Sequence, residues 1–181
     1  MTANEIVADA RMLKVRELKT ALEKANQRAV RAESELDTLR AHFDLALAAL
    51  ADFSAMGAGG KMLIVDGWNS ILKKRNTAKL PPEEVKRLKA AMLARVRASL
   101  DAGEFARAWV VFDGHDENSF ADGALRISYT GGSGLHRADR LIFDFVHCAF
   151  LLGLDVSRLA VETSDKDVAR KVAGFGVLEV P

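Results

Sequence analysis

The sequence predicts an α/β fold, with a central, mainly parallel sheet between two layers of helices and one long helix ahead of it. Short apolar runs that end in a carboxylate recur after residue 61, and stretches with helical periodicity separate them. Strands that alternate with helices favour a parallel sheet, because each parallel connection needs a crossover. Residues 15–53 instead keep an unbroken 3-4 spacing of apolar positions, which is typical of a coiled-coil helix.

Length and composition limit the class of protein. The chain has 181 residues, of which 49% are hydrophobic, enough for one medium-sized domain with an extension. The single cysteine, Cys148, excludes an internal disulfide, and its apolar neighbours predict a buried position. The N-terminus lacks the apolar region of a signal peptide, and the longest apolar stretch, 143–154, is too short to cross a bilayer. We therefore expect a cytoplasmic protein without a membrane segment.

The long helix is predicted from its heptad pattern. The stretch from Val15 to Phe53 contains no glycine or proline, and its apolar residues occupy two heptad positions. One position holds Val15, Leu22, Ala29, Leu36, Phe43 and Leu50, and the other holds Leu18, Ala25, Ala32, Leu39, Ala46 and Phe53. At about 1.5 Å per residue this helix would be roughly 60 Å long. We predict that residues 1–53 form a coiled coil, pairing with a second copy of the chain. Folding back on its own domain and pairing with a different protein are the alternatives.

Charges beside the heptad positions favour one orientation of such a homodimer. In a parallel, in-register pair, Arg28 would attract Glu33 of the other helix, and Glu35 would attract Arg40. Lys14 would lie opposite Lys19, and these two like charges would repel. Each exposed pair contributes less than ~1 kcal/mol, so an antiparallel pair stays open. The alanines at heptad positions do not specify the number of helices.

A short segment of small residues separates the long helix from the predicted domain. Residues 54–60 contain three glycines and two alanines, a composition typical of a linker. We therefore expect the compact domain to occupy residues 61–181.

The elements of this domain follow from local patterns. Apolar or alternating runs predict strands at 61–66, 107–113, 124–129, 158–163 and 176–180. Periodic stretches predict helices at 69–75, 82–100, 137–152 and 165–173. The second of these begins with Pro81-Pro82-Glu83-Glu84, since proline and acidic residues suit a first helical turn. We expect loops at the polar stretch 116–123 and at the glycine-rich stretch 130–134.

Four carboxylates stand where strands end or helices begin. Asp66 and Asp113 each end a strand and precede a glycine, Asp165 follows the strand at 158–163, and Asp139 lies at the start of a helix. The carboxyl ends of parallel strands lie at one edge of a sheet, where such folds bind ligands. We expect the four carboxylates to converge there. Taken singly, each aspartate could equally be a turn or helix-cap residue, above all Asp139 and Asp165.

A cluster of carboxylates predicts a metal site. Like charges this close repel unless a cation neutralises them, and Mg²⁺ or Mn²⁺ prefers oxygen ligands. A bound metal lowers the pKa of a water molecule and stabilises charge on a phosphoryl group, so hydrolysis of a phosphodiester is the expected reaction. We expect Asp66, Asp139 and Asp165 to bind the metal and Asp113 to bind it directly or through water. Asn69 would orient a water molecule or a carboxylate, and Ser164 and Asp167 would support the ligands.

The distribution of charge favours a polyanionic substrate. The chain has a net charge of only +1, but the segment from Lys73 to Arg97 has nine basic residues against two acidic ones, a net charge of +7. We expect Lys73, Lys74 and Arg75 to bind phosphates next to the Asp66 turn, with Arg137 contributing. A solvated helix face is the alternative interpretation of the same charges.

Two further side chains could contact a polyanionic substrate. Trp68 lies in the turn beside the predicted site and could stack on a base, whereas Trp109 belongs to the core of a strand. His115 could contact a phosphate or only hydrogen-bond within its loop.

The order and spacing of these motifs resemble those of NYN domains. The motifs are Val65-Asp66-Gly67-Trp68-Asn69, Phe112-Asp113-Gly114-His115, Ala138-Asp139 and Thr163-Ser164-Asp165. They are most similar to the YacP-like branch of the PIN-like nuclease superfamily, over residues 61–180, with Trp68 in place of the usual tyrosine. The resemblance implies a PIN-like three-layer α/β/α fold and an Mg²⁺- or Mn²⁺-dependent ribonuclease. It also implies metal-binding carboxylates at Asp66, Asp113, Asp139 and Asp165.

We therefore expect a metal-dependent endoribonuclease that its coiled coil dimerises or tethers. A non-catalytic RNA-binding or scaffold protein with the same fold is the main alternative. A phosphatase acting on small phosphoesters is a third, although it would not need the segment of +7 charge. DNA stays open as a substrate, because nothing in the sequence identifies a group that contacts a 2′-hydroxyl.

Overall fold

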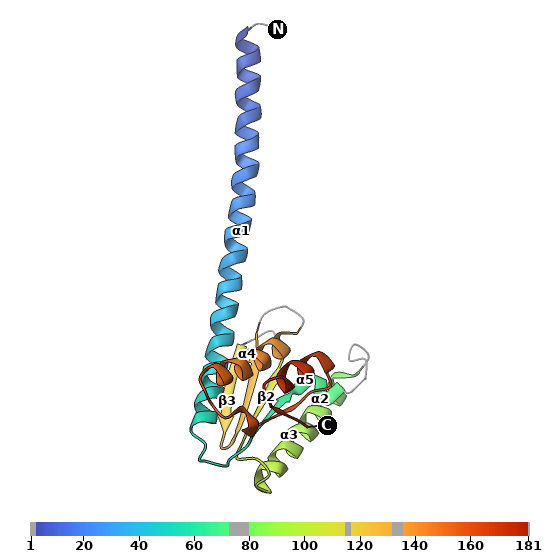
Figure 1. Cartoon of the computed structure of the whole chain (residues 1–181). Coiled ribbons are helices and arrows are strands. Elements are labelled where there is room, and N and C mark those ends of the chain that lie inside the picture. The colour runs from blue at the N-terminus through green and yellow to red at the C-terminus, as the bar shows by residue number, and fades with distance from the viewer. Residues whose placement is uncertain (1–2, 73–79, 115–116, 132–135, 181) are drawn as a thin grey trace. The chain divides into compact units, whose positions relative to one another are not determined.

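The computed structural model describes residues 3–72, 80–114, 117–131 and 136–180 as a mixed α/β protein. The chain divides into two compact units, Met1–Arg40 and Ala41–Pro181. The first unit is the N-terminal part of helix α1 (Ala3–Ser54), which continues into the second unit without a break (Figure 1). The second unit contains the sheet and all the other helices.

The second unit is built on one six-stranded sheet with the order β3-β4-β2-β1-β5-β6. The strands are β1 (Met62–Asp66), β2 (Arg107–Phe112), β3 (Glu117–Asp122), β4 (Leu125–Thr130), β5 (Leu159–Glu162) and β6 (Leu178–Val180). Every neighbouring pair is parallel except β3 and β4, which form an antiparallel hairpin at one edge. The predicted central, mainly parallel sheet is thereby confirmed.

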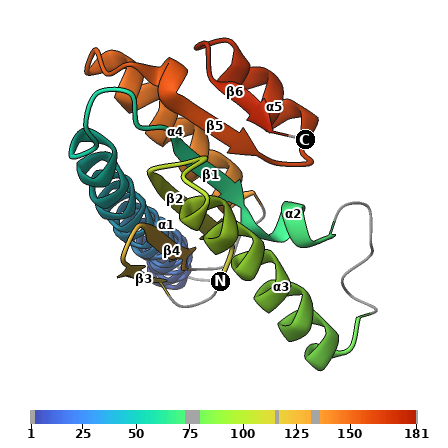
Figure 2. The same cartoon turned by 90° about the horizontal axis from the view of Figure 1, so that it is seen from below.

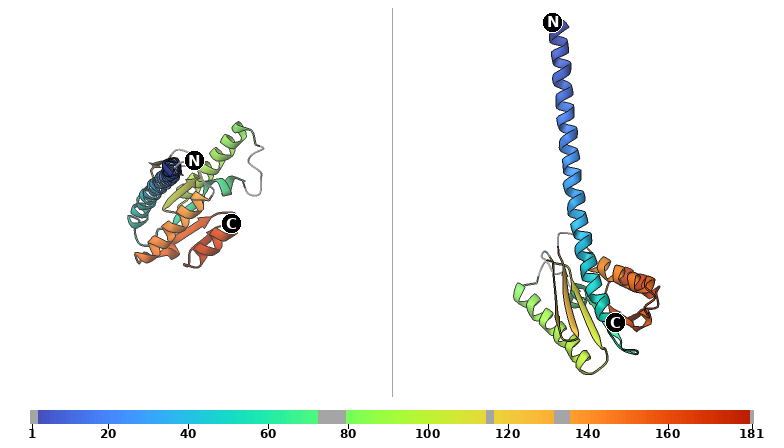
Figure 3. Two further views of the ribbon diagram at one scale, coloured as in Figure 1. Left: turned by 90° about the horizontal axis from the view of Figure 1, so that it is seen from above. Right: turned by 90° about the vertical axis from the view of Figure 1, so that its left-hand side faces the viewer.

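Helices cover both faces of this sheet. On one face lie α2 (Gly67–Leu72) and α3 (Pro82–Asp101), and on the other lie α4 (Arg137–Leu151), α5 (Lys166–Ala173) and residues 41–54 of α1 (Figure 2). Figure 3 shows the sheet between α3 and α4. Ile64 packs toward α4, and its neighbours Leu63 and Val65 pack toward α3. Because both faces are buried, the central strands are apolar throughout instead of alternating.

The last turns of α1 belong to the core of the second unit. Leu45, Ala46, Ala49, Leu50 and Phe53 are all buried in the cluster around α4. The ring of Phe53 lies edge-on to that of Phe145, with centroids 6.4 Å apart. The compact unit therefore begins at Ala41, twenty residues before the predicted domain start at Lys61, because these side chains pack on the domain itself.

The predicted linker at 54–60 is held against the domain. Arg158, in the 3₁₀ turn Val156–Arg158, donates hydrogen bonds to the carbonyl oxygens of Gly60 (2.7 Å) and Gly57 (2.8 Å). The same guanidinium lies 5.5 Å from the centre of the Phe53 ring. These contacts fix the connection between α1 and β1.

The polar stretch 116–123 was predicted to be a loop, and this prediction is wrong for residues 117–122, which form β3. The strand pairs with β4 on one side only, so it is an edge strand with little to bury; Phe120 is 45% exposed. An edge strand of this kind lacks the apolar alternation that reveals a strand in a sequence. Gly123, with φ +62°, turns the hairpin.

Cys148 lies in α4 and packs against the core, but it is half-buried and not fully buried as predicted. Within the described part of the chain, no helix is both long enough and apolar enough to cross a membrane.

Candidate metal centre

The site lies at the edge where the parallel strands β1, β2 and β5 end. Asp66 is the last residue of the central strand β1, and only 2% of it is exposed. The next residue, Gly67, begins α2 directly against the ring of Phe112: a Cβ at this position would lie 2.4 Å from that ring. A glycine is therefore needed at position 67 for packing, since a larger residue would push α2 away from the sheet.

Asn69 joins two of the predicted ligands. Its side-chain amide donates to Asp66 Oδ2 at 2.5 Å and to Asp139 Oδ1 at 3.5 Å. Its backbone N–H donates to the other oxygen of Asp66 at 3.3 Å, and the hydroxyl of Thr163 donates to Asp66 Oδ2 at 3.1 Å. Asp66 thus has a fixed position, and its carboxylate is close to that of Asp139.

The pKa of Asp66 is raised from its ordinary value of 3.8 to about 7. Burial is the largest cause, and the carboxyl group of Asp139 adds to it, whereas the hydrogen bonds from Asn69 oppose it. Without a cation, ionising both carboxylates at neutral pH is costly. A bound divalent cation would remove this cost.

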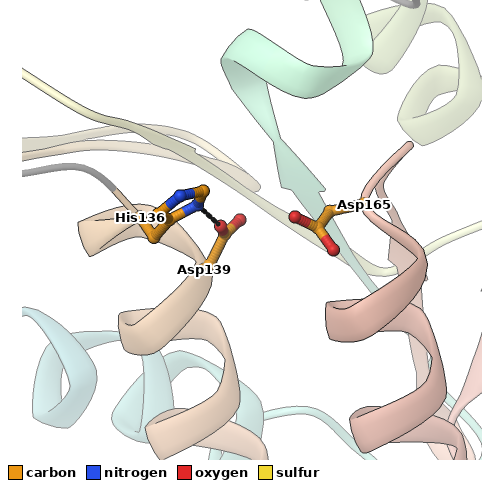
Figure 4. Close-up of side chains that lie close together, drawn as sticks. All are labelled: His136, Asp139 and Asp165. Carbon is orange, nitrogen blue, oxygen red and sulfur yellow. Dashed lines mark hydrogen bonds and ion pairs between the residues drawn. The ribbon is translucent and has the colours of Figure 1, made fainter.

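Three further side chains meet between α4 and α5. Asp139 lies in the first turn of α4, and the Nδ1 atom of His136 is 2.8 Å from its Oδ2. Asp165 approaches from the start of α5, with its carboxylate turned toward Asp139 (Figure 4). One ligand atom from each of His136, Asp139 and Asp165 lies within 4.8 Å of the others. This spacing is compatible with one shared cation.

Asp165 is also the N-cap of α5. Its Oδ1 accepts hydrogen bonds from the backbone N–H groups of Asp167 (2.7 Å) and Val168 (3.2 Å). The capping interpretation therefore describes this residue correctly. Capping holds one carboxylate oxygen and orients the group for a second role.

Asp113 holds the start of α4. Its Oδ1 accepts from the backbone N–H of Ala138 at 2.7 Å and from the Thr130 hydroxyl at 3.3 Å. The N-cap residue of this helix, His136, has φ +63° and makes no side-chain capping bond. Asp113 therefore caps α4 from a distant strand and positions Asp139. It lies beside the group formed by His136, Asp139 and Asp165 and is not a member of it.

An open cleft of about 510 Å³ lies beside these ligands, between α4 and α5. Its lining consists of His136, Asp139, Arg140, Phe143, Asp165, Asp167, Val168 and Lys171. Arg140 and Lys171 bring positive charge next to the carboxylates. The cleft can therefore hold a negatively charged group beside a cation.

On the opposite face of the sheet, a buried carboxylate holds α2 and α3 together. Glu162 Oε1 accepts from the hydroxyl of Ser70 at 2.5 Å and from the guanidinium of Arg95 at 2.6 Å. Glu162 is almost fully buried, whereas Arg95 is half exposed. This contact fixes the helix that carries Asn69.

The predicted RNA-binding residues have different positions. Lys73, Lys74, Arg75 and His115 lie outside the described residues. The indole N–H of Trp68 donates to the carbonyl oxygen of Asp113 at 2.7 Å, and its ring packs edge-on against Phe112. Arg137 donates to the carbonyl oxygen of Thr130 at 3.1 Å. Trp68 and Arg137 thus support the loops around the site.

The two residues predicted to support the ligands lie beside Asp165. Ser164 donates from its hydroxyl to the carbonyl oxygen of Asn69 at 3.1 Å, which connects α2 to the loop after β5. Asp167 is exposed, lines the cleft and pairs with Arg170 at 2.8 Å.

His136 and Lys171 were not predicted from the sequence. The only sequence signal for His136 is its position three residues before Asp139. In the structure, hydrogen bonding to Asp139 raises the pKa of this exposed imidazole. Lys171 reaches the cleft because α5 packs beside α4, a contact that local patterns do not reveal.

Comparisons with known proteins add little to this description. No protein-family model and no curated protein matches the sequence. Among solved structures, the chain is similar to a tryptophan-to-leucine mutant of Rae1 (YacP) from Bacillus subtilis, with 20% identity and a TM-score of 0.48, covering 66% of this chain and 68% of that one. At this level of similarity, the function has to be argued from the site.

Proposed function

We propose that this protein is a metal-dependent endoribonuclease of the NYN type, within the PIN-like superfamily. The observation that carries the proposal is the convergence of Asp66, Asp139 and Asp165, with Asn69 and His136, at the carboxyl edge of a parallel sheet. The order of the motifs around these residues, described above, supports the same class.

The donor groups fit a divalent cation. Three carboxylates and one imidazole gather on helix starts and a strand end. Burial, together with the neighbouring carboxyl group of Asp139, raises the pKa of Asp66, and a bound cation would relieve this cost of ionisation. A bound Mg²⁺ or Mn²⁺ would supply an activated water molecule and stabilise charge on the phosphoryl group. Asp66, Asp139 and Asp165 would hold the ion, with Asp113 beside them and His136 as an additional ligand.

The remaining groups of the site would bind and orient the RNA. Arg140 and Lys171 line the cleft and would attract the phosphates of the strand to be cleaved. Asn69 keeps the carboxylates of Asp66 and Asp139 at a fixed separation, so that little rearrangement is needed when substrate arrives. Lys73, Lys74 and Arg75 would extend the binding surface along the RNA.

His136 favours Mn²⁺ as the ion. Imidazole is a better ligand for Mn²⁺ than for Mg²⁺, which prefers an all-oxygen environment. We expect the His136→Ala variant to bind Mn²⁺ about tenfold more weakly, with little change for Mg²⁺. Isothermal titration calorimetry with each metal measures this directly. An equal loss for both metals would contradict the preference for Mn²⁺, and no loss for either metal would exclude His136 as a ligand.

The activity itself is tested with a circular single-stranded RNA, since only an endonuclease can cut a molecule without ends. Cleavage should require Mn²⁺ or Mg²⁺ and stop with EDTA. It should fall about a hundredfold or more in Asp66→Asn and Asp165→Asn. Asp122→Asn is the matched control, because Asp122 is an exposed aspartate in the β3–β4 hairpin that pairs with Arg97, outside the candidate site.

Other outcomes would support the alternatives. RNA binding without cleavage by the folded wild-type protein would point to a scaffold. Hydrolysis of small phosphoesters without RNA cleavage would point to a phosphatase. Replacing Lys73, Lys74 and Arg75 with glutamine should weaken RNA binding and leave small-substrate hydrolysis unchanged if the protein is a nuclease. A parallel assay with circular DNA decides between the two nucleic acids.

A further inference from the structure

We propose that residues 15–43 of α1 form a parallel, two-stranded coiled coil with a second copy of this chain, and that this coiled coil ends where the compact unit begins to use the same helix. The proposal concerns an interaction surface and does not depend on the proposed activity.

From Leu18 to Phe43, the heptad positions of α1 are exposed although they are apolar. Leu18 and Leu22 are 59% and 61% exposed, and Leu36, Leu39 and Phe43 are exposed as well. Together with the alanines between them, these residues form the α1 seam, defined here as the heptad positions from Val15 to Phe43. A single helix leaves this row of side chains in water, although most of the stability of a helix in a protein comes from packing its apolar face.

The same heptad continues into the compact unit, but there it is buried within the chain. Ala46, Leu50 and Phe53 follow Phe43 in the repeat without a break, and none of them is more than 6% exposed. The two parts of the helix therefore pack differently. Its last turns pack on α4 and the sheet, and the α1 seam remains available to another molecule. Folding back, one of the sequence alternatives, accounts only for the last turns.

Charge complementarity favours a second copy as the occupant. In a parallel, in-register pair, Arg28 faces Glu33 of the other helix, and Glu35 faces Arg40. Glu35 already pairs with Arg31 of its own helix at 2.9 Å, so it can join charges within and between helices. The same side chains that flank the seam therefore complement one another across a symmetric dimer. Lys14 opposite Lys19 is the one repulsive contact.

The first experiment measures the mass of the full-length protein by light scattering after size-exclusion chromatography. We expect twice the chain mass of 19.7 kDa. The double variant Leu36→Lys and Leu39→Lys should elute as a monomer. The midpoint temperature at which its compact unit unfolds should stay the same as in wild type. A monomeric or trimeric wild-type protein would overturn the proposal, as would a dimer that survives both lysines.

Val30→Lys is the matched control. Val30 is 65% exposed on the same helix, but it lies outside the two heptad positions. This variant should remain a dimer. If it dissociates as readily as the double variant, general charge on the helix rather than the seam decides the association.

Orientation is tested by disulfide cross-linking in a Cys148→Ser background. Identical heptad positions face one another only in a parallel, in-register pair, so Leu36→Cys should cross-link to itself on oxidation. In an antiparallel pair each residue of one heptad position faces one of the other position, and the register that pairs Val15 with Leu39 also sets position 36 opposite position 18. Cross-linking only in a mixture of the Leu18→Cys and Leu36→Cys proteins would therefore overturn the parallel arrangement.

Discussion

Asp66 combines almost complete burial with a position next to another carboxylate, and both features act on its protonation. Its pKa of about 7 lies above its ordinary value of 3.8, so in the metal-free protein the folded state binds a proton more tightly than the unfolded state. The stability that this group contributes is complete below about pH 4 and is lost as the pH rises to about 7. A site that is strained at neutral pH in this way is typical of groups placed for function.

We therefore predict that Asp66→Asn changes how stability depends on pH. The quantity compared is the unfolding free energy of the variant minus that of wild type, both measured in EDTA. This difference should be roughly 1–3 kcal/mol more favourable to the variant at pH 8 than at pH 4, because asparagine carries no charge to bury. Urea unfolding at several pH values measures this difference. Asp122→Asn should show no such trend, since Asp122 is exposed. A difference for Asp66→Asn that stays constant between pH 4 and pH 8 would contradict the prediction.

His136 shows how a residue with an unremarkable sequence context joins the site. It is the only non-glycine residue with positive φ among those described, and this conformation brings its ring to Asp139 at the start of α4. A left-handed conformation at a helix start is uncommon for histidine, and here it directs the imidazole toward the carboxylates.

Among the elements, α4 depends on a contact that comes from another part of the sheet. Asp113, which follows β2, accepts the hydrogen bond from the backbone N–H of Ala138 that a local cap would otherwise accept. Its carboxylate also lies near the positive end of the helix dipole. The same residue can therefore stabilise the fold and contribute to a metal site.

Two substitutions of Asp113 separate these roles. Asp113→Ala should lose about 1 kcal/mol of unfolding free energy, because α4 loses its capping acceptor. Asp113→Asn should stay close to wild type in stability, because its amide oxygen still accepts the hydrogen bond. If Asp113 also binds the metal, the Asn variant should cleave RNA more slowly while remaining as stable as wild type. Chemical unfolding and the circular-RNA assay measure the two properties, and equal stability of both variants would show that the cap contributes nothing.

At the scale of the whole molecule, α1 serves two compact units. Residues 41–54 supply Leu45, Leu50 and Phe53 to the core beside α4, whereas the described residues before them belong to a separate compact unit and lie outside that core. A single continuous helix therefore contributes to two different compact units.

This division predicts the outcome of two truncations. A chain that begins at Ala41 should unfold cooperatively. The midpoint temperature of its unfolding should be close to that of the compact unit in the full-length protein. A chain that begins at Lys61 loses several fully buried apolar side chains, each contributing about 1.5–3 kcal/mol. That loss is comparable to the total stability of a domain, roughly 5–15 kcal/mol, so this chain should not fold. Circular dichroism during thermal unfolding measures both, and a stable, cooperative chain beginning at Lys61 would contradict the prediction.

The sequence by itself determined the central strands, the main helices and the class of sheet. Runs such as Leu63-Ile64-Val65 are apolar because both faces of the sheet are covered, and this information is local. The places of Asp66 and Asp165 at the ends of strands also follow from local patterns, because all parallel strands that neighbour one another end at the same edge.

Tertiary structure alone decided which of these residues meet and what each contacts. The strand β3 exists through its pairing with β4, the cap of α4 comes from Asp113, and Thr163 reaches Asp66 across 97 positions in the sequence. The point at which the heptad of α1 changes from exposed to buried is equally invisible in the repeat, since Phe43 and Ala46 continue the same pattern. The physical reason is the same in each case: these contacts join segments that are distant along the chain, and their geometry is set only when the sheet and its helices pack together.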